Sequence, residues 1–193
     1  MHRNKREELI RIASILIHRK GYRHTTLADV SRESGLLLGS LYYYFRTKES
    51  LATAIIEDHE RTFDNRIAQW ERLPDPSARL EAFLDMVLEN QAEYVRCGCP
   101  VGSLSQELGK DEPDLAKKIN RILTKQVHWI ARQFDALGVQ DSTQKGEHWV
   151  AQIQGFILLS NAFGNPELLQ RQIDGLRKSL TGSPSGSSNL TRI

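Results

Sequence analysis

Residues 35–45 read GLLLGSLYYYF, and this stretch decides the fold of the chain. Its leucines are typical of a buried helix. Its three tyrosines, followed by Phe45 and then by the residues RTK, are typical of a surface that meets a charged partner. A helix over residues 38–45 turns by about 100° per residue and so has two faces. The apolar face holds Leu38, Leu41 and Phe45. The other face holds Ser40, Tyr43 and Tyr44, with Tyr42 on the flank. We therefore expect one face to pack and the other to be free to enter a groove.

Two helices are predicted before this stretch. Apolar residues at Leu9, Ile12, Ala13, Leu16 and Ile17 follow the helical period and indicate a helix over about residues 5–20, which Gly21 ends. Thr25 or Thr26 is expected to cap a second, short helix that Gly35 closes. Two short helices joined by a glycine-containing turn form the arrangement in which one helix can lie in the major groove of DNA.

The remainder of the chain also has only the helical period. It predicts helices over about residues 48–71, 77–96, 102–109, 113–137, 144–163 and 166–180. Thr47 is the expected N-cap of the first of these, Pro74 and Pro76 interrupt the pattern, and RCGCPVG at 96–102 is expected to be a turn. We predict an all-α fold of about nine helices, with a helix-turn-helix domain at 1–47, a larger helical domain at 48–181, and a disordered Gly/Ser/Pro-rich tail at 182–193.

The charge is distributed unevenly along the chain. Residues 1–50 hold ten Lys and Arg against five Asp and Glu, whereas residues 51–193 hold sixteen against nineteen. A basic front suggests that this part meets a polyanion. No run of 18 apolar residues predicts a membrane span, no signal-peptide core follows the N-terminus, and the two cysteines are too few for a disulfide framework. A cytoplasmic protein without a membrane partner is expected.

The segments TTLADVSRESG (25–35), LYYYF (41–45) and KESL (48–51) together resemble the N-terminal signature of the TetR family of bacterial transcriptional repressors. The resemblance spans about residues 8–53 and fixes residue types across three helices. GCPVGSLSQEL (98–108) is similar to a motif in one branch of that family. The resemblance implies an N-terminal DNA-binding domain and a C-terminal domain for ligand binding and dimerisation.

The resemblance also implies roles for individual residues in binding double-stranded DNA. Thr26 and Lys48 would contact phosphates, Ser40 and Tyr43 would reach base edges, and Tyr42 and Tyr44 would reach phosphates or bases. Hydroxyl groups and a lysine independently suit phosphate oxygens. The chain departs from the family at Leu37 and Leu38, where members usually have small, polar or basic residues. Leu37 then either packs against thymine methyl groups or is simply exposed.

The larger domain is expected to enclose a pocket for a small-molecule effector among its first five helices. The candidate lining residues are Phe83, Met86, Val87, Tyr94, Cys99, Leu104, Trp129 and Phe156. Each aromatic side chain in this set, taken singly, is better explained as core. No catalytic constellation, metal site or cofactor is predicted, so we do not expect an enzyme, and a thiol-dependent enzyme acting through Cys99 is the weaker hypothesis.

Cys97 and Cys99 allow a second interpretation. A redox- or metal-sensing regulator could act through them, with His128 or His148 nearby. However, cysteines separated by one residue form a poor disulfide, and two thiolates alone do not complete a tetrahedral zinc site. The simpler interpretation is a turn that connects two helices, with one thiol packed as a small apolar group.

The last two helices suggest a homodimer. The residues expected at its interface are Trp149, Ile153, Phe156 and Ile157 on one helix and Leu168, Leu169, Ile173, Leu176 and Leu180 on the other. A two-fold dimer presents two recognition helices to a palindromic operator. The function expected from the sequence is a ligand-responsive repressor that releases its operator when a small molecule binds.

Overall fold

The computed structural model describes residues 5–181, and every regular element in that range is a helix. The helices are α1 (Lys5–Lys20), α2 (Leu27–Ser34), α3 (Leu38–Tyr44), α4 (Lys48–Trp70), α5 (Pro76–Glu89), α6 (Gln91–Cys97), α7 (Pro100–Asp111), α8 (Pro113–Ala136), α9 (Ser142–Phe163) and α10 (Pro166–Thr181). The predicted all-α fold class is confirmed. The tail prediction for 182–193 lies outside the described residues.

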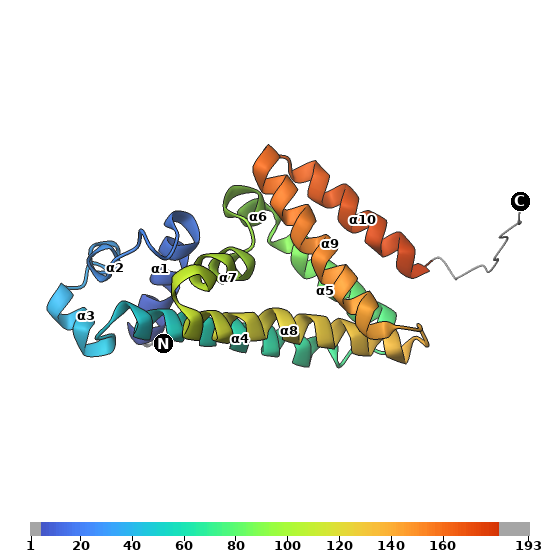
Figure 1. The fold of residues 1–193 in the computed structure, drawn as a ribbon, viewed down its shortest axis with the longest axis horizontal. Helices are drawn as coiled ribbons and strands as arrows, with labels where there is room; N and C mark the ends of the chain where they lie inside the picture. The colour runs from blue at the N-terminus through green and yellow to red at the C-terminus, as the bar shows by residue number, and fades with distance from the viewer. Residues whose placement is uncertain (1–4, 182–193) are drawn as a thin grey trace, which may run out of the picture.

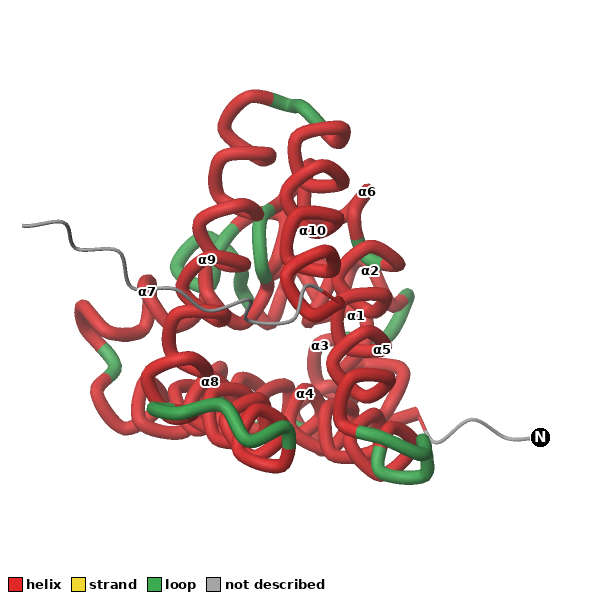
Figure 2. The backbone as a smooth tube through the Cα atoms, turned by 90° about the vertical axis from the view of Figure 1, so that its right-hand side faces the viewer, coloured by secondary structure: helices red, strands yellow, loops and turns green. Residues whose placement is uncertain are grey.

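The helices form two ends joined by a long pair. In Figure 1, α1, α2 and α3 gather at one end, while α4 and α8 run side by side along the length of the molecule. The α9–α10 hairpin leans over α5 and α8 at the other end (Figures 1 and 2). The helix α7 lies between the α1–α3 end and the rear helices, where it contacts both α1 and α8.

The helix predicted over 77–96 is two helices in the structure. It breaks at Asn90, whose side-chain amide donates to the carbonyl oxygen of Met86 at 2.7 Å. A side chain that bonds its own backbone in this way competes with the regular helical hydrogen bonds. The break reorients α6, so that Cys97 and Gly98 approach the end of α1.

Two hydrophobic cores lie along the molecule. The front core joins residues of α1–α3 and the first half of α4 to residues of α7 and α8, including Leu41, Ile55, Leu108 and Ile119. The rear core joins the second half of α4 to α5, α8, α9 and α10. Because α7 and α8 contribute to the front core, the helices before residue 47 do not pack as a unit separate from the rest.

The residues predicted for the dimer interface do not form one exposed face. Trp149, Ile153 and Ile157 of α9 are buried in the rear core, as are Leu169, Ile173 and Leu176 of α10. Phe156 and Leu180 are partly buried against the same core. The six buried residues therefore pack within the protomer and not against a partner, so their assignment to the interface was wrong. Leu168 is half-buried and lies outside this core, and a homodimer through the last two helices stays a prediction.

A different apolar face of α9 is open to solvent. Leu158 is 62% exposed, Phe163 is 67% exposed, and Leu159 is also exposed. We call these three residues the α9 outer face. Within residues 5–181, no helix is both long and apolar enough to cross a membrane.

Candidate nucleic-acid interface and effector cavity

The helix α3 separates a packing face from an exposed polar face. Leu41 and Phe45 are buried in the front core, while Ser40 and Tyr42 are exposed and Tyr43 is 86% exposed. The short helix α3 therefore presents tyrosine hydroxyls to solvent on the side opposite its packing face. Such a face offers hydrogen-bond donors and acceptors to a ligand but stabilises no core of its own.

Two residues of α3 are not on the faces of the helix that the sequence predicted for them. Leu38 was expected on the packing face, but it is 36% exposed and is not part of the front core. Tyr44 was assigned to the open face, but it is half-buried against the front core, with its ring edge-on to that of Tyr43 at 5.3 Å. These corrections follow from the short length of α3, because only its last turn reaches the neighbouring helices.

Leu37 is 80% exposed and occupies the N-cap position of α3. The loop before it is held by Ser31, whose hydroxyl donates to the carbonyl oxygen of Leu36 at 2.6 Å. Leu37 is thus exposed in the chain without DNA, and both alternatives for it, contact with a thymine methyl group and simple exposure, stay predictions.

Thr26, and not Thr25, caps α2. Its hydroxyl donates to the Asp29 carboxylate at 2.7 Å and accepts from the Asp29 backbone N–H at 3.1 Å. Hydrogen bonds from the Thr26 side chain and backbone hold the pKa of Asp29 at about 2. Thr25 is buried and donates to the carbonyl oxygen of Gly21. A phosphate at the start of α2 would compete with Asp29 for the Thr26 hydroxyl.

Lys48, at the first position of α4, anchors the loop between α1 and α2. Its ammonium nitrogen lies 4.2 Å from the centre of the Tyr22 ring and donates to the carbonyl oxygen of Arg23 at 3.2 Å. Burial first, and then the neighbouring carboxylates of Glu112, Glu49 and Glu107, raise the pKa of Tyr22 to about 12. Lys48 therefore has a structural role against Tyr22 of the front core and is also a candidate phosphate contact.

Arg46 is an additional candidate for phosphate contact. It is exposed in the turn between α3 and α4, directly after the packing residue Phe45. The sequence signal was present in the run RTK that follows Phe45, but of these three residues the family resemblance assigned a phosphate contact only to Lys48.

The helix α7 holds the loop between α1 and α2 through Glu107. One carboxylate oxygen accepts from the backbone N–H of Tyr22 and the other from that of Arg23, both at 2.7 Å. Arg23 also pairs with Asp111 of α7. Gly21 has a φ of +86°, and a Cβ there would lie 3.2 Å from both Glu107 oxygens, so this approach favours glycine. Sequence reasoning missed Glu107, although it lies in the GCPVGSLSQEL stretch.

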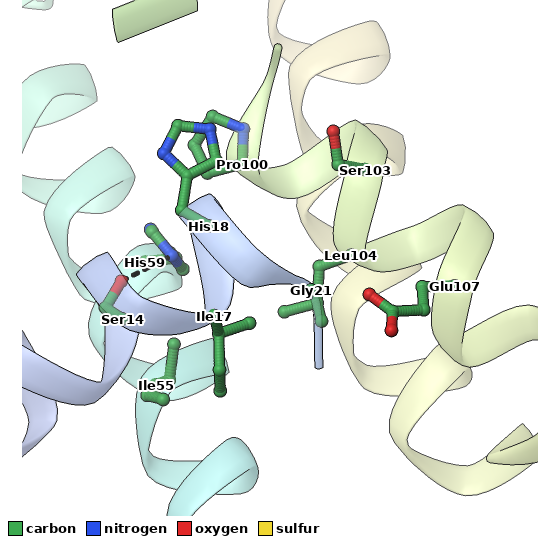
Figure 3. A pocket seen from close by; sticks show the side chains of 10 residues that line it. All are labelled: Ser14, Ile17, His18, Gly21, Ile55, His59, Pro100, Ser103, Leu104 and Glu107. Atoms are coloured by element: carbon green, nitrogen blue, oxygen red, sulfur yellow. Dashed lines mark hydrogen bonds between the residues drawn. The ribbon is translucent and has the colours of Figure 1, made fainter. Parts of the chain in front are cut away.

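Cavities lie where α1, α4, α6 and α7 meet. One of about 360 Å³ is lined by residues of α1, α4, α6 and α7 and by Asn90, which lies between α5 and α6. Its lining residues are Ser14, Ile15, His18, Arg19, His59, Asn90, Glu93, Tyr94 and Pro100. A smaller one of about 50 Å³ shares four of these and extends to Leu104 and Glu107 (Figure 3). Burial, ahead of the nearby His18, lowers the pKa of His59, whose Nε2 lies 3.4 Å from the Ser14 hydroxyl.

The predicted effector-lining residues are divided among several places. Tyr94 lines the larger cavity and Leu104 the smaller one, while Cys99 lines a third of about 210 Å³ between α7 and α9. Phe83, Val87 and Trp129 are buried in the rear core, and Met86 and Phe156 pack partly buried against it. Of the aromatic residues that the sequence offered as pocket walls, Phe83 and Trp129 stack on each other in the rear core. Tyr94 lines the cavity at α1 together with smaller polar residues.

The two cysteines are not joined in a disulfide and have different surroundings. The Cys99 sulfur is the N-cap of α7, where it accepts from the backbone N–H of Gly102 at 3.4 Å and from the Gln154 amide at 3.5 Å. The histidine beside Cys97 is His18 of α1. Neither cysteine therefore needs the other for its contacts.

Comparison with known proteins adds independent findings. Residues 9–55 match the family described as bacterial regulatory proteins, tetR family. An uncharacterised HTH-type transcriptional regulator from the lacX 3′ region of Lactococcus lactis subsp. lactis is 29% identical over 183 residues, which cover 92% of this chain and 93% of the relative.

Solved structures of TetR-type regulators have the same arrangement of helices as this chain. The regulatory protein TetR from Rhodobacter sphaeroides is 27% identical, with a TM-score of 0.76 over 89% of this chain and 96% of that one. A TetR transcriptional regulator from Legionella pneumophila has a TM-score of 0.83 over 93% of this chain and 99% of that one, and at 17% identity it shows the shared fold.

Proposed function

We propose that this chain, a member of the tetR family of bacterial transcriptional regulators, binds a palindromic operator as a homodimer, represses the adjacent gene, and releases the DNA when a small molecule binds. The observation that carries the proposal is the division of α3 into a buried apolar face and an exposed face of Ser40, Tyr42 and Tyr43. An exposed tyrosine face contributes little to folding, so a role in recognition accounts for it better than packing does.

The contacts to DNA would divide by chemistry. Ser40 and Tyr43 would reach base edges, while Arg46, Lys48 and the Thr26 region would position the domain on phosphates. Tyr42 lies beside Tyr43 on the exposed face and Tyr44 supports its ring. Serine and tyrosine discriminate weakly between bases, so part of the specificity is expected to come from DNA shape.

The α9 outer face supports association with a second copy of the chain. Leu158, Leu159 and Phe163 form an exposed apolar surface on one helix, and such surfaces mark interaction sites. A two-fold arrangement would bring two α3 helices to half-sites about 34 Å apart, the repeat of one DNA turn. Bound to a promoter in the cytoplasm, such a dimer would exclude polymerase.

Release by an effector would act through the junction of α1, α4 and α7. An occupant of the 360 Å³ cavity touches α1 and α4 together, and α7 grips the α1–α2 loop through Glu107. Because α7 and α8 share the front core with the helix-turn-helix, a shift of either helix would be passed on to it. A ligand that prefers a shifted arrangement would draw the two recognition helices out of register, and about 1–3 kcal/mol of coupling is typical.

The test is selection of duplex DNA from a random library by the full chain. We expect a palindromic site with half-sites about one turn apart and two chains per duplex. Recovered sequences without two-fold symmetry, or one chain per site, would contradict the proposal.

The effector part of the proposal needs a second experiment. Compounds that raise the melting temperature of the full chain would be tested for operator release. Ile15→Trp fills part of the cavity from an exposed position on α1, so it should block release while leaving operator affinity unchanged. Release that is undiminished in this variant would place the effector elsewhere.

A further inference from the structure

A group of three metal-ligand side chains lies at the edge of the larger cavity. One ring nitrogen of His18, one carboxylate oxygen of Glu93 and the sulfur of Cys97 all lie within 4.8 Å of one another. Glu93 and Cys97 are four residues apart on α6, so they share one face of that helix. His18 meets this face from the last turn of α1. Two ligands spaced by one helical turn and a third from another helix can surround a single ion.

The donor set suits a thiophilic divalent ion. Zinc binds thiolate sulfur at about 2.3 Å and imidazole nitrogen or carboxylate oxygen at about 2.0–2.2 Å, which puts tetrahedral ligand atoms roughly 3.3–3.6 Å apart. From separations within 4.8 Å, the side chains would rotate toward the ion to reach this geometry, and Glu93 is exposed and can adjust.

The orientation of His18 provides an independent observation. Its Nε2 lies 2.9 Å from the carbonyl oxygen of Gly98. A carbonyl oxygen only accepts hydrogen bonds, so Nε2 carries the proton and the lone pair of the neutral ring is on Nδ1. Metal-binding histidines characteristically donate their other N–H to a backbone carbonyl or carboxylate, which fixes the ring.

The surroundings of the three side chains leave room for an ion. Glu93 forms an ion pair with Arg96, which lies three residues further along α6. Both partners of this ion pair are about half exposed, and pairs of that kind contribute little stability that an ion would need to replace. The larger cavity borders His18 and Glu93 and leaves room for a water molecule as the fourth ligand. Arg96 and Arg19 are two nearby positive charges, which the thiolate and the carboxylate together balance.

We propose that His18, Glu93 and Cys97 form a binding site for one Zn²⁺ ion, completed by water. Binding displaces the thiol proton of Cys97 and ties α1, which belongs to the helix-turn-helix, to α6 behind it. The ion would thereby fix the position of α1 at the junction where the effector cavity lies. The consequence for operator affinity rests on the proposed function, whereas metal binding does not.

The test uses Co²⁺ and Zn²⁺ with the full chain, free of any added histidine tag. Co²⁺ bound to a cysteine thiolate gives a sulfur-to-metal charge-transfer absorption, which Zn²⁺ should abolish by replacing it at one ion per chain. Cys97→Ser should remove this absorption and weaken Zn²⁺ binding at least about tenfold, and Glu93→Gln should weaken binding with the absorption retained.

Cys99→Ser is the matched control, because its thiol lies two residues away and contacts Gln154 instead. His2→Ala controls for a histidine outside the described residues. Both variants should bind as the unmodified chain does. Absorption that survives Cys97→Ser, or disappears in Cys99→Ser, would overturn the site.

Operator binding distinguishes failure of the site from failure of its regulatory role. With one equivalent of Zn²⁺, we expect operator affinity to change at least about fivefold in the unmodified chain and not in Cys97→Ser. Metal binding through Cys97 without any change in operator affinity would overturn the regulatory consequence and leave the site standing. Failure to bind any operator at all would count against the proposed function alone.

Discussion

Arg46 and Lys48 stand two residues apart, yet their surroundings give them different roles. Arg46 is exposed, whereas the Lys48 ammonium lies over the Tyr22 ring and donates to the Arg23 carbonyl. Both side chains are positively charged, so their charge in the sequence does not indicate that they have different roles. Only the fold shows that one of them also holds the α1–α2 loop.

We expect Arg46→Ala to lower the slope of log affinity against log salt by about 0.9, the value for one lost phosphate contact. The melting temperature should not change, because Arg46 is exposed. Lys48→Ala should lower both the salt slope and the melting temperature, since a cation–π contact and a hydrogen bond are lost. Salt titrations of operator binding and thermal unfolding of both variants measure the difference, and equal melting temperatures for both would refute it.

His59 gives the protein a specific response to acid. Burial lowers the pKa of the folded state's His59 below its ordinary value of 6.5. Below pH 6.5 the unfolded chain therefore binds a proton that the folded chain does not, and the free energy of unfolding falls as the pH falls. Above about pH 7.5 His59 is neutral in both states and the effect is absent.

Replacing His59 with Gln should flatten this dependence. Between pH 7.5 and the lowered pKa, the free energy of unfolding of His59→Gln should fall less steeply than that of the unmodified chain. Urea unfolding at several pH values measures it. His18, which lines the same cavity, is replaced separately as a control. A slope unchanged by His59→Gln would show that its pKa is not lowered.

At the scale of the elements, the pairing of α8 with α9 depends on one glycine. A Cβ at Gly146 would lie 2.7 Å from the carbonyl oxygen of Val127 and 3.0 Å from the backbone nitrogen of Ala131. Backbone atoms cannot move aside as the end of a side chain can, so α9 would have to shift away from α8. The glycine therefore permits a close approach of the two helices.

Gly146→Ala should lower the free energy of unfolding by about 1–3 kcal/mol, the usual cost of overpacking a core. Gly109→Ala is the matched control, since a Cβ there meets nothing within 4 Å and the position is exposed in α7. Alanine in a helix is favoured over glycine, so this control should gain about 0.5–1 kcal/mol. Chemical denaturation of both variants provides the comparison, and a neutral Gly146→Ala would contradict the close approach.

Several elements were predictable from the sequence, and the reasons are local. The caps at Thr26 and Thr47 and the glycine ends at Gly35 and Gly138 act within one helical turn. The break at Asn90 was not predicted, because the apolar period continues across it. The sequence also did not indicate what packs against the apolar residues of α9. Helical periodicity shows that such residues share a face, but not whether the same chain or a second copy covers that face.

In the candidate site, too, features set by local sequence were predictable and features set by long-range packing were not. The open face of α3 follows from its own wheel, so Ser40 and Tyr43 could be proposed from the sequence. Glu107 contacts residues about 85 positions earlier in the chain, and the cavity is built from four helices. Contacts of this range depend on how the helices pack, which a single sequence does not indicate.

At the scale of the whole molecule, association should depend on the α9 outer face. Leu158→Glu places a charge at the centre of an exposed apolar surface, and a buried unpaired charge is costly at an interface. We expect sedimentation to show a dimer for the unmodified chain and a monomer for Leu158→Glu, with the helix content unchanged. Leu137→Glu, an exposed leucine at the end of α8, should remain a dimer. A dimer that persists in Leu158→Glu would place the interface elsewhere.

The central claim is that the exposed face of α3 binds DNA, and Tyr43 tests it most directly. Tyr43 is 86% exposed, so its replacement should not affect folding. Operator affinity and melting temperature of Tyr43→Ala, measured side by side, should show affinity reduced about ten- to a hundredfold at an unchanged melting temperature. Unchanged affinity, or affinity that falls only in step with the melting temperature, would contradict the account.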